Sequence, residues 1–183
     1  MEQVERFARI FRGLEKAYGA VDLASSSEGE KKKGRYKFIQ EPRTMETFEG
    51  HLKGETSIGI VPINEENKCI WGAIDIDKYP LDHSAIVKKI EKLKYPLVVC
   101  RSKSGGGHIY LFLKRFVAAE KVQSKLKEIT AELGYAANTE VFPKQIKLVL
   151  QRGDNGNFLN IPYFNHESGL RYAFKSDGSA ATL

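Results

Sequence analysis

Residues 71–77 read WGAIDID, an apolar strand pattern that ends in two carboxylates. Because side chains alternate along a β-strand, we expect Asp75 and Asp77 to project from one face and Ile74 and Ile76 from the other. Two carboxylates held this close repel each other, which raises a pKa unless a cation neutralises them. Hard divalent cations take oxygen ligands. The stretch therefore indicates either a metal site or, as is more common for this pattern, a strand that runs into a solvated acidic turn.

The segments around this strand alternate between strand and helix patterns. Residues 57–63 and 68–77 are rich in Ile and Val and predict an antiparallel hairpin closed by NEEN. One helix is predicted from an N-cap at Asp82 or Ser84 to a stop before Pro96, and another carries Val122 to Leu133. Short strands are predicted at 97–100, 108–113, 140–142 and 146–150. This β-β-α-β-β-α-β-β order predicts an α/β (α+β) fold, a mixed sheet with helices on one side.

The two ends of the chain carry less information. Helical spacing predicts a helix over 2–18 and a short one over 44–52. Between them SSSEGEKKKGRY, residues 25–36, predicts a basic loop that either contacts phosphates or is merely solvated. Residues 166–183 are expected to be a tail, and their end, SDGSAATL, is either a frayed terminus or the place where a longer protein was cut.

Composition limits the class of protein. The chain has 183 residues, 42% of them hydrophobic, which predicts a single soluble globular domain over 1–183. The net charge of +6 suits a polyanionic partner. Cys69 and Cys100 lie in apolar runs without a CxxC spacing, so we expect buried thiols in a reducing compartment and no zinc. No apolar run approaches the ~18 residues that span a bilayer, so we expect a cytoplasmic protein without a membrane partner.

A glycine-rich loop follows the predicted strand at 97–100. Residues 101–108 read RSKSGGGH and combine two cations and two hydroxyls with three glycines. Glycines let backbone amides approach a ligand closely, and successive amides can form a concave anion site. The loop is not a P-loop, because GxxxxGK[ST] is absent. We therefore predict phosphate binding, with a flexible loop as the alternative, and His108 alone would more often be structural.

Glu140 opens the predicted strand in NTEVFPKQ, residues 138–145. If its strand neighbours those of Asp75 and His108, three carboxylates and an imidazole meet on one surface. Such a surface suits two divalent ions ~3.5–4 Å apart, which clamp the attacking and leaving oxygens of a phosphoryl displacement. Taken alone, Glu140 is an ordinary surface residue.

Four stretches together resemble the archaeo-eukaryotic primase superfamily: IDID at 74–77, SKSGGGHIYLF at 102–112, EVFPKQ at 140–145 and GNFLNIPYF at 156–164. The resemblance is closest to the primase-polymerases of bacterial conflict systems, CRISPR-associated systems and mobile elements, and covers about residues 45–165. It implies an RRM-like mixed β-sheet catalytic core over 57–165 with helices packed on it, and a small N-terminal α/β lobe over 1–56.

The resemblance also implies roles for residues. Asp75, Asp77 and Glu140 would hold two Mg²⁺ or Mn²⁺ ions, with Asp154 as the competing third ligand because Thr139 before Glu140 departs from the hydrophobic residue of the family motif. The small-x-His motif, Gly106-Gly107-His108, and the hydroxyls of Ser102 and Ser104 would contact the triphosphate of the incoming nucleotide. From charge and proximity, we predict that Lys103 and Lys144 neutralise it. Further predicted nucleotide contacts are Arg101, Asn160 and Tyr163.

Template and primer contacts are predicted at basic positions outside the motifs. They are Lys31, Lys32, Lys33, Arg35 and Arg152. Tyr163 and Phe164 in IPYF either stack on a sugar or base or pack in the core.

The implied activity is template-dependent nucleotidyl transfer from NTP or dNTP to a 3′-hydroxyl. The partners would be a single-stranded DNA or RNA template and a primer, with helicase or CRISPR partners and further domains outside this chain. The alternatives are a metal-dependent nuclease and a non-catalytic RRM-like nucleic-acid-binding module. The glycine loop argues against the first, and paired aspartates where an RNA-binding sheet exposes aromatics argue against the second.

Overall fold

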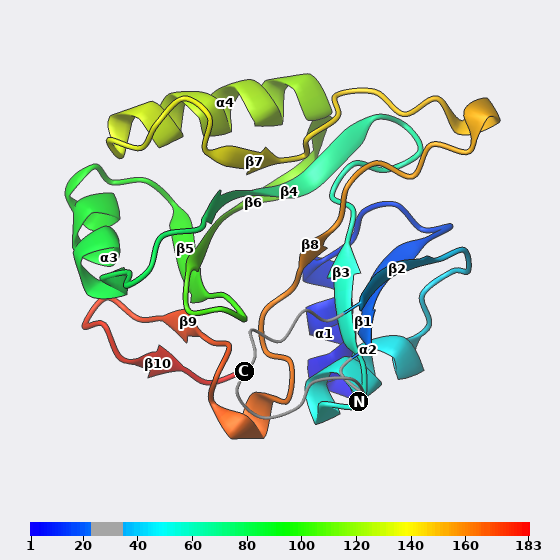
Figure 1. Cartoon of the computed structure of the whole chain (residues 1–183), viewed down its shortest axis with the longest axis horizontal. Helices are drawn as coiled ribbons and strands as arrows, with labels where there is room; N and C mark the ends of the chain where they lie inside the picture. The colour runs from blue at the N-terminus through cyan, green and yellow to red at the C-terminus, as the bar shows by residue number, and fades with distance from the viewer. Residues whose placement is uncertain (23–34) are drawn as a thin grey trace.

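The computed structural model describes residues 1–22 and 35–183, which form two β-sheets and four α-helices (Figure 1). The larger sheet has six strands in the order β10-β9-β5-β6-β4-β7, and the smaller has four in the order β2-β1-β3-β8. The predicted α+β class is confirmed. In the part of the chain that the structure describes, no helix is long and apolar enough to cross a membrane.

The centre of the larger sheet consists of two consecutive β-α-β units. Its centre follows the order β4-α3-β5-β6-α4-β7 along the chain and β5-β6-β4-β7 in space, with antiparallel pairing between neighbours. This is the split βαβ arrangement of RRM-like domains, as predicted, although the pairings are antiparallel where a mixed sheet was expected. The elements are β4 (Lys68–Ile76), α3 (His83–Lys92), β5 (Leu97–Arg101), β6 (Gly107–Ala118), α4 (Ala119–Glu132), β7 (Glu140–Phe142), β9 (Ala173–Phe174) and β10 (Ala180–Ala181).

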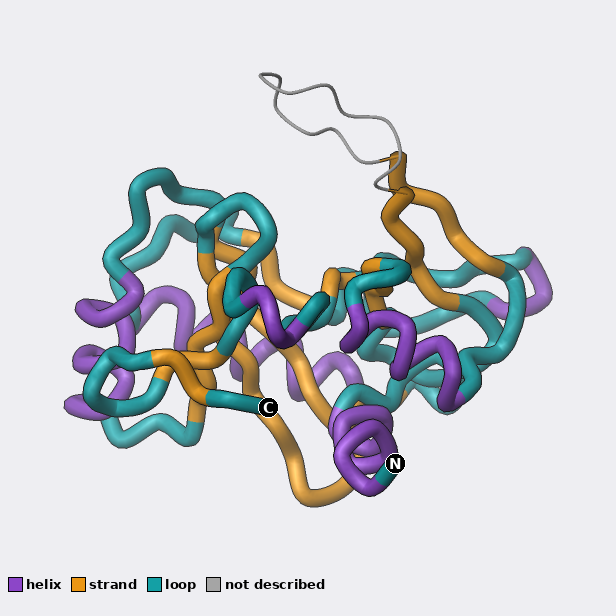
Figure 2. Tube along the Cα trace, turned by 90° about the horizontal axis from the view of Figure 1, so that it is seen from below, coloured by secondary structure: helices purple, strands orange, loops and turns teal. Residues whose placement is uncertain are grey.

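The smaller sheet gathers strands from both ends of the chain. β8 comes from the C-terminal third and pairs with β3, beside the N-terminal strands (Figure 1). The elements are α1 (Glu2–Ile10), β1 (Tyr18–Asp22), β2 (Arg35–Ile39), α2 (Met45–Lys53), β3 (Ser57–Ile60) and β8 (Leu159–Asn160). One 3₁₀ turn, Leu150–Arg152, precedes β8 and another, His166–Ser168, follows it. Figure 2 shows the chain turned by 90° from this view, with its strands in orange and its helices in purple.

Two layers of apolar side chains cover the two faces of the larger sheet. On one face Ile74, Ile76 and Ile109 pack against α3 and α4, and Gly72 lets α4 approach β4, since a Cβ there would lie 2.7 Å from the Leu126 Cδ1. On the other face Trp71 packs with Tyr110 of β6 and with Phe11, which directly follows α1. Alternation along β4 therefore turns Asp75, like Trp71, toward the smaller sheet.

The predicted hairpin over 57–77 is wrong. β3 pairs with β1 and β8, whereas β4 pairs with β6 and β7 in the other sheet. The chain does turn after Asn64, whose Oδ1 accepts hydrogen bonds from the backbone amides of Glu66 and Lys68. All four residues of β3 are buried. Burial of both faces of β3, rather than the turn that follows it, therefore determines which strands pair with it.

Other expected boundaries also differ. The first helix ends at Ile10 rather than at 18, because the chain at Gly13 packs against Val61 so closely that a Cβ would lie 2.0 Å from the Val61 oxygen. Residues 146–149 form no strand, and the Leu148 amide instead donates to the Asn67 side chain. Within residues 166–183, β9 pairs with β5 and β10 with β9.

Two further predictions concern the basic loop and the cysteines. Residues 25–34 of the predicted basic loop lie outside the described residues, while Arg35 and Tyr36 begin β2. Cys69 and Cys100 are free and buried, as predicted.

Candidate active site

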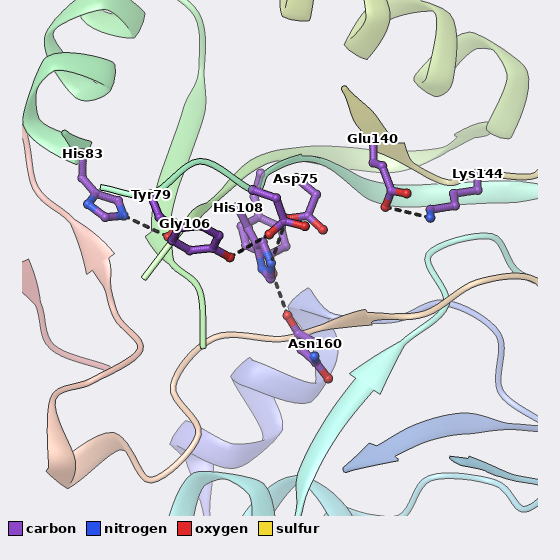
Figure 3. Close-up of polar contacts among 10 residues, drawn as sticks. Asp75, Tyr79, His83, Gly106, His108, Glu140, Lys144 and Asn160 are labelled. Atoms are coloured by element: carbon purple, nitrogen blue, oxygen red, sulfur yellow. Dashed lines mark hydrogen bonds and ion pairs between the residues drawn. The ribbon is translucent and has the colours of Figure 1, made fainter. Parts of the chain in front are cut away.

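Three strands bring the predicted acidic and imidazole side chains into one row. Asp75 on β4 is the cross-strand partner of Glu140 on β7 and of His108 on β6. The Cβ atoms of directly opposed residues in a sheet lie about 4.5–5.5 Å apart. Figure 3 shows their side chains, with Asp75 between Glu140 and His108. The expected convergence of residues that are 65 positions apart in the sequence is therefore confirmed for these three residues.

Each carboxylate has a different neighbour. Glu140 Oε2 lies 2.7 Å from Lys144 Nζ, and Asp77 Oδ1 accepts a hydrogen bond from the Tyr79 hydroxyl at 2.9 Å (Figure 3). Asp75 Oδ1 lies 3.4 Å from His108 Nε2. Asp75 is the most enclosed of the three, with 16% of its side chain exposed against 54% for Glu140.

The environment of Asp75 resists a negative charge. Burial raises the pKa of Asp75 to about 7, and the charges of Asp77 and Glu140 act in the same direction, while Lys144 acts against them. The fold thus holds an excess of negative charge that the nearby lysine does not balance. That excess is what a bound cation would offset.

His108 contacts the hydroxyl of a buried tyrosine on the side of its ring away from Asp75. The Tyr110 hydroxyl donates to the Asn160 backbone oxygen at 3.3 Å and lies 3.2 Å from His108 Nδ1. Because the hydroxyl has one proton, this pattern makes Nδ1–H the donor and leaves the lone pair of Nε2 toward Asp75. Burial lowers the pKa of His108 to about 4, and buried Arg171 acts in the same direction. The imidazole is therefore neutral at pH 7.

The glycine-rich loop forms a tight turn between β5 and β6. The amide of Ser102 donates to the Gly106 oxygen, and the amide of Gly105 donates to the Ser102 oxygen. A Cβ on Gly106 would lie 2.4 Å from the Ile76 oxygen, so glycine there permits the loop to pack against the end of β4. Two amides of the predicted anion nest are thus used inside the turn. The side chains of the loop are what face the site.

A cavity of about 440 Å³ lies between the two sheets at this row. The larger sheet and its loop contribute the three carboxylates, His108, Lys144, Phe142 and residues 102–104, and the smaller sheet contributes Tyr36, Phe158, Leu159 and Asn160. Lys103 Nζ lies 5.9 Å from the centre of the Tyr36 ring and so faces the smaller sheet. The cavity has the size of a small-ligand site.

The structure does not bring every predicted site residue to this cavity. Gly106 and Gly107 lie beside it but do not line it, and Arg101 donates instead to the Leu170 oxygen. Tyr163 packs against the same apolar cluster as Trp71 and does not line the cavity, which supports the core-packing interpretation of IPYF. Arg152 lies in an exposed 3₁₀ turn. Lys31, Lys32 and Lys33 lie outside the described residues, and only the backbone of Arg35 is described.

The structure also compares the two candidates for the third carboxylate. The two oxygens of Asp154 accept hydrogen bonds from the backbone amides of Val149 and Gly156 and close a turn. Asp154 does not line the cavity, whereas Glu140 does. The geometry therefore favours Glu140.

Several residues of the site were not predicted. Phe158 lies over Gly19 and Gly59, which face each other across β1 and β3, and a Cβ on either would come within 2.4 Å of its ring. Tyr36, Tyr79 and Tyr110 carry no motif that would single them out. The alternation in HIYLF does place Tyr110 on the same face as His108, and this signal could have indicated a contact between them.

The donor set fits a hard divalent cation, but the side chains are not gathered around one point. Among the residues of 1–22 and 35–183, no group of three or more His, Cys, Asp or Glu side chains is arranged to hold a metal ion. Glu140 is instead turned to Lys144, in an ion pair that is partly exposed and so contributes about 1 kcal/mol or less. Breaking this ion pair to turn Glu140 toward Asp75 and Asp77 therefore costs little, and a cation bound there would offset the repulsion among the three carboxylates. These oxygen ligands are those that Mg²⁺ and Mn²⁺ prefer.

Comparison with known families identifies the family of the chain. The family described as the archaeo-eukaryotic primase domain of the TOTE conflict system matches residues 2–174. The match extends beyond the 45–165 stretch that carries the motifs and includes the N-terminal elements. No curated protein matches the chain.

Proposed function

Because the chain belongs to the archaeo-eukaryotic primase family of the TOTE conflict system, we propose that it is a template-dependent nucleotidyltransferase. In this reaction a 3′-hydroxyl oxygen forms a bond to the α-phosphorus of a nucleoside triphosphate. The bond from that phosphorus to the bridging oxygen breaks, pyrophosphate leaves with the electron pair, and the hydroxyl proton is released. The reaction needs no nucleophilic side chain.

One observation carries the proposal: the three carboxylates and the hydroxyl and cationic side chains of residues 102–104 line one cavity between the sheets. A nucleoside triphosphate needs positive charge and hydroxyl donors along its phosphates, and carboxylates at the reacting end to hold cations. Divalent cations bound to these carboxylates would lower the pKa of the attacking hydroxyl and offset the charge on the α-phosphate.

The phosphates fit the side of the cavity that carries the glycine-rich loop. Ser102 and Ser104 offer hydroxyl donors and Lys103 a cation, while Lys144 lies on the opposite side of Asp75, next to Glu140. Charge-assisted hydrogen bonds to phosphate are the strong ones, so we assign these four side chains to the triphosphate. His108 contacts a phosphate oxygen only if Nε2 carries a proton, and the contact with Tyr110 instead favours the proton on Nδ1.

The base fits the wall that the smaller sheet supplies. Tyr36 and Phe158 present aromatic rings to the cavity, 6.2 Å apart between ring centres. Base–aromatic stacking is largely independent of sequence, which suits an enzyme that takes each of four nucleotides. The nucleotide would thus lie between the two sheets.

The proposal is tested by incubating the purified chain with labelled NTP or dNTP, Mg²⁺ or Mn²⁺ and single-stranded template, with and without primer. Product without primer indicates a primase, and extension alone indicates a polymerase. Shortening of the template without any synthesis would overturn the proposal in favour of a nuclease.

The matched variants are two pairs of carboxylates. Asp75→Asn with Asp77→Asn should abolish synthesis while the thermal unfolding transition stays cooperative. Glu91→Gln with Glu120→Gln, two exposed carboxylates on α3 and α4, should leave synthesis unchanged. Full activity of the first pair would show that the carboxylate row is not the reaction centre.

A further inference from the structure

A second hollow, of about 250 Å³, borders the same carboxylates from another direction. It shares Asp75, Asp77 and Glu140 with the cavity between the sheets and has otherwise different walls. Those walls are Ile76, Lys78, Tyr135, Ala136, Asn138 and Thr139. The carboxylate row is thus the common wall of two hollows, and a ligand in each would meet the other at the carboxylates.

The chain itself explains this arrangement. Lys78 directly follows Asp77, and Asn138 and Thr139 directly precede Glu140. The segment after β4 and the segment before β7 therefore both lie beside the row of carboxylates, because β4 and β7 are paired neighbours. Tyr135 is brought to the same place by the end of α4.

The two hollows differ in charge and size. The larger has two lysines and two serine hydroxyls, as a triphosphate requires. The smaller has one lysine, one amide, one threonine hydroxyl and a tyrosine ring, with Lys78 Nζ 5.6 Å from the centre of the Tyr135 ring. A cation next to an aromatic ring, without further positive charge, suits a sugar and a single phosphodiester rather than a triphosphate.

We propose, resting on the nucleotidyltransferase function above, that this second hollow binds the 3′-terminal nucleotide of the strand that is extended. Lys78 contacts the last phosphodiester, Tyr135 packs against the terminal sugar or base, and Asn138 and Thr139 donate hydrogen bonds to the sugar-phosphate. The 3′-hydroxyl then lies at the carboxylates, facing the α-phosphate of the nucleotide in the larger cavity. The bonds formed and broken are those of the nucleotidyl transfer described above.

Kinetics with two substrates test this assignment. Lys78→Ala should raise the KM for a primer–template duplex about tenfold, which corresponds to a contact of about 1.4 kcal/mol, and leave the KM for the nucleotide within about twofold. Lys92→Ala, an exposed lysine on α3 that lines neither hollow, should change neither constant. A rise in the KM for the nucleotide without a rise for the primer would overturn the assignment, as would an effect of Lys92→Ala equal to that of Lys78→Ala.

Cross-linking tests the position without relying on synthesis. An Asn138→Cys variant, mixed with a duplex whose terminal 3′ nucleotide carries a thiol tether, should form a disulfide at least about tenfold faster than a Lys92→Cys variant. The two native cysteines should not compete, because they are buried. Equal rates for the two variants would overturn the assignment.

The outcomes separate the two proposals. If the unaltered chain extends primers but Lys78→Ala keeps its primer KM, the second hollow is not the primer site and the nucleotidyltransferase function stands. If the unaltered chain neither binds nor extends a primer–template duplex, the function itself fails and this assignment fails with it.

Discussion

Asp75 lies directly opposite Glu140 in the β4–β7 pairing, so two carboxylates are cross-strand neighbours in the sheet. Like charges in this position destabilise a sheet. Lys144 offsets Glu140 at 2.7 Å, but Asp75, the more buried of the two, has no lysine or arginine among its ion pairs in the described part of the chain. The fold thus retains a charge arrangement that does not favour its own stability, as is common where function requires it.

Asp75→Asn should stabilise the protein and inactivate it. Burial, together with the charges of Asp77 and Glu140, raises the pKa of Asp75 to about 7, and an uncharged amide of the same size removes this buried charge. At pH 8 without divalent ions we therefore expect unfolding to cost about 1 kcal/mol more. Synthesis should fall about a hundredfold or more, since the proposed metal site loses one of its carboxylates. Urea unfolding and a primer-extension assay check both effects. A destabilised variant would contradict the electrostatic effect of the Asp75 charge, and an active variant would contradict its role in synthesis.

Tyr110→Phe should release His108 while keeping the core filled. The ring of Tyr110 is fully buried and stacks with Phe112, and phenylalanine preserves that packing. Loss of the hydroxyl leaves His108 Nδ1 and the Asn160 oxygen without this partner, which should cost about 1–3 kcal/mol. Nitrogen NMR shifts of the imidazole should report protonated Nδ1 in the unaltered chain and a mixture of tautomers in the variant. Protonated Nε2 in the unaltered chain would contradict the hydrogen-bond pattern inferred here.

Gly106→Ala should disturb the glycine-rich loop more than Gly107→Ala. The added Cβ would lie 2.4 Å from the backbone oxygen of Ile76 at position 106, but 3.0 Å from the flexible end of Leu81 at position 107. Because backbone cannot move aside cheaply, we expect about 2 kcal/mol of destabilisation for Gly106→Ala and less for Gly107→Ala. Thermal unfolding of the two variants measures the difference. Equal losses would mean that the loop is not packed against β4 as described.

His51 should make the protein less stable in mild acid. Its Nδ1 accepts from the Ile58 amide and its Nε2–H donates to the Pro162 oxygen, and burial lowers its pKa to about 4, with Arg171 acting in the same direction. The unfolded chain therefore binds more protons between pH 6.5 and 4 than the folded one. The stability that neutral His51 contributes is fully present above pH 6.5 and is lost as the pH falls through 4. The free energy of unfolding falls in this range by up to about 1.4 kcal/mol per pH unit.

The control for this prediction compares how steeply the free energy of unfolding changes with pH in the unaltered chain and in a His51 variant. His51→Gln should be less stable at pH 7 because its hydrogen bonds are poorer, yet its free energy of unfolding should fall less steeply between pH 6.5 and 4.5. The difference in slope isolates His51, since the other titrating groups are common to both proteins. Parallel slopes would mean that His51 is already charged in the folded state.

The sequence alone determined the type and face of the central elements. Alternation in WGAIDID placed Asp75 and Ile74 on opposite faces, and the predicted strand at 97–100 and two helices on one side were found close to the expected residues. The third carboxylate was also found in the expected neighbouring strand. These features depend on local periodicity and on turn residues, which are written in short stretches of sequence.

Only the tertiary structure decided which strands pair and what closes the site. β3 and β4 carry the same apolar pattern but belong to different sheets, and the wall formed by Tyr36, Phe158 and Asn160 comes from strands more than 100 residues apart. Pairing of this kind is selected by burial against distant side chains, such as Phe158 over Gly19 and Gly59, and by close approaches such as that of Gly13 to Val61. No local pattern encodes these contacts, because each depends on residues that meet only when the chain is folded.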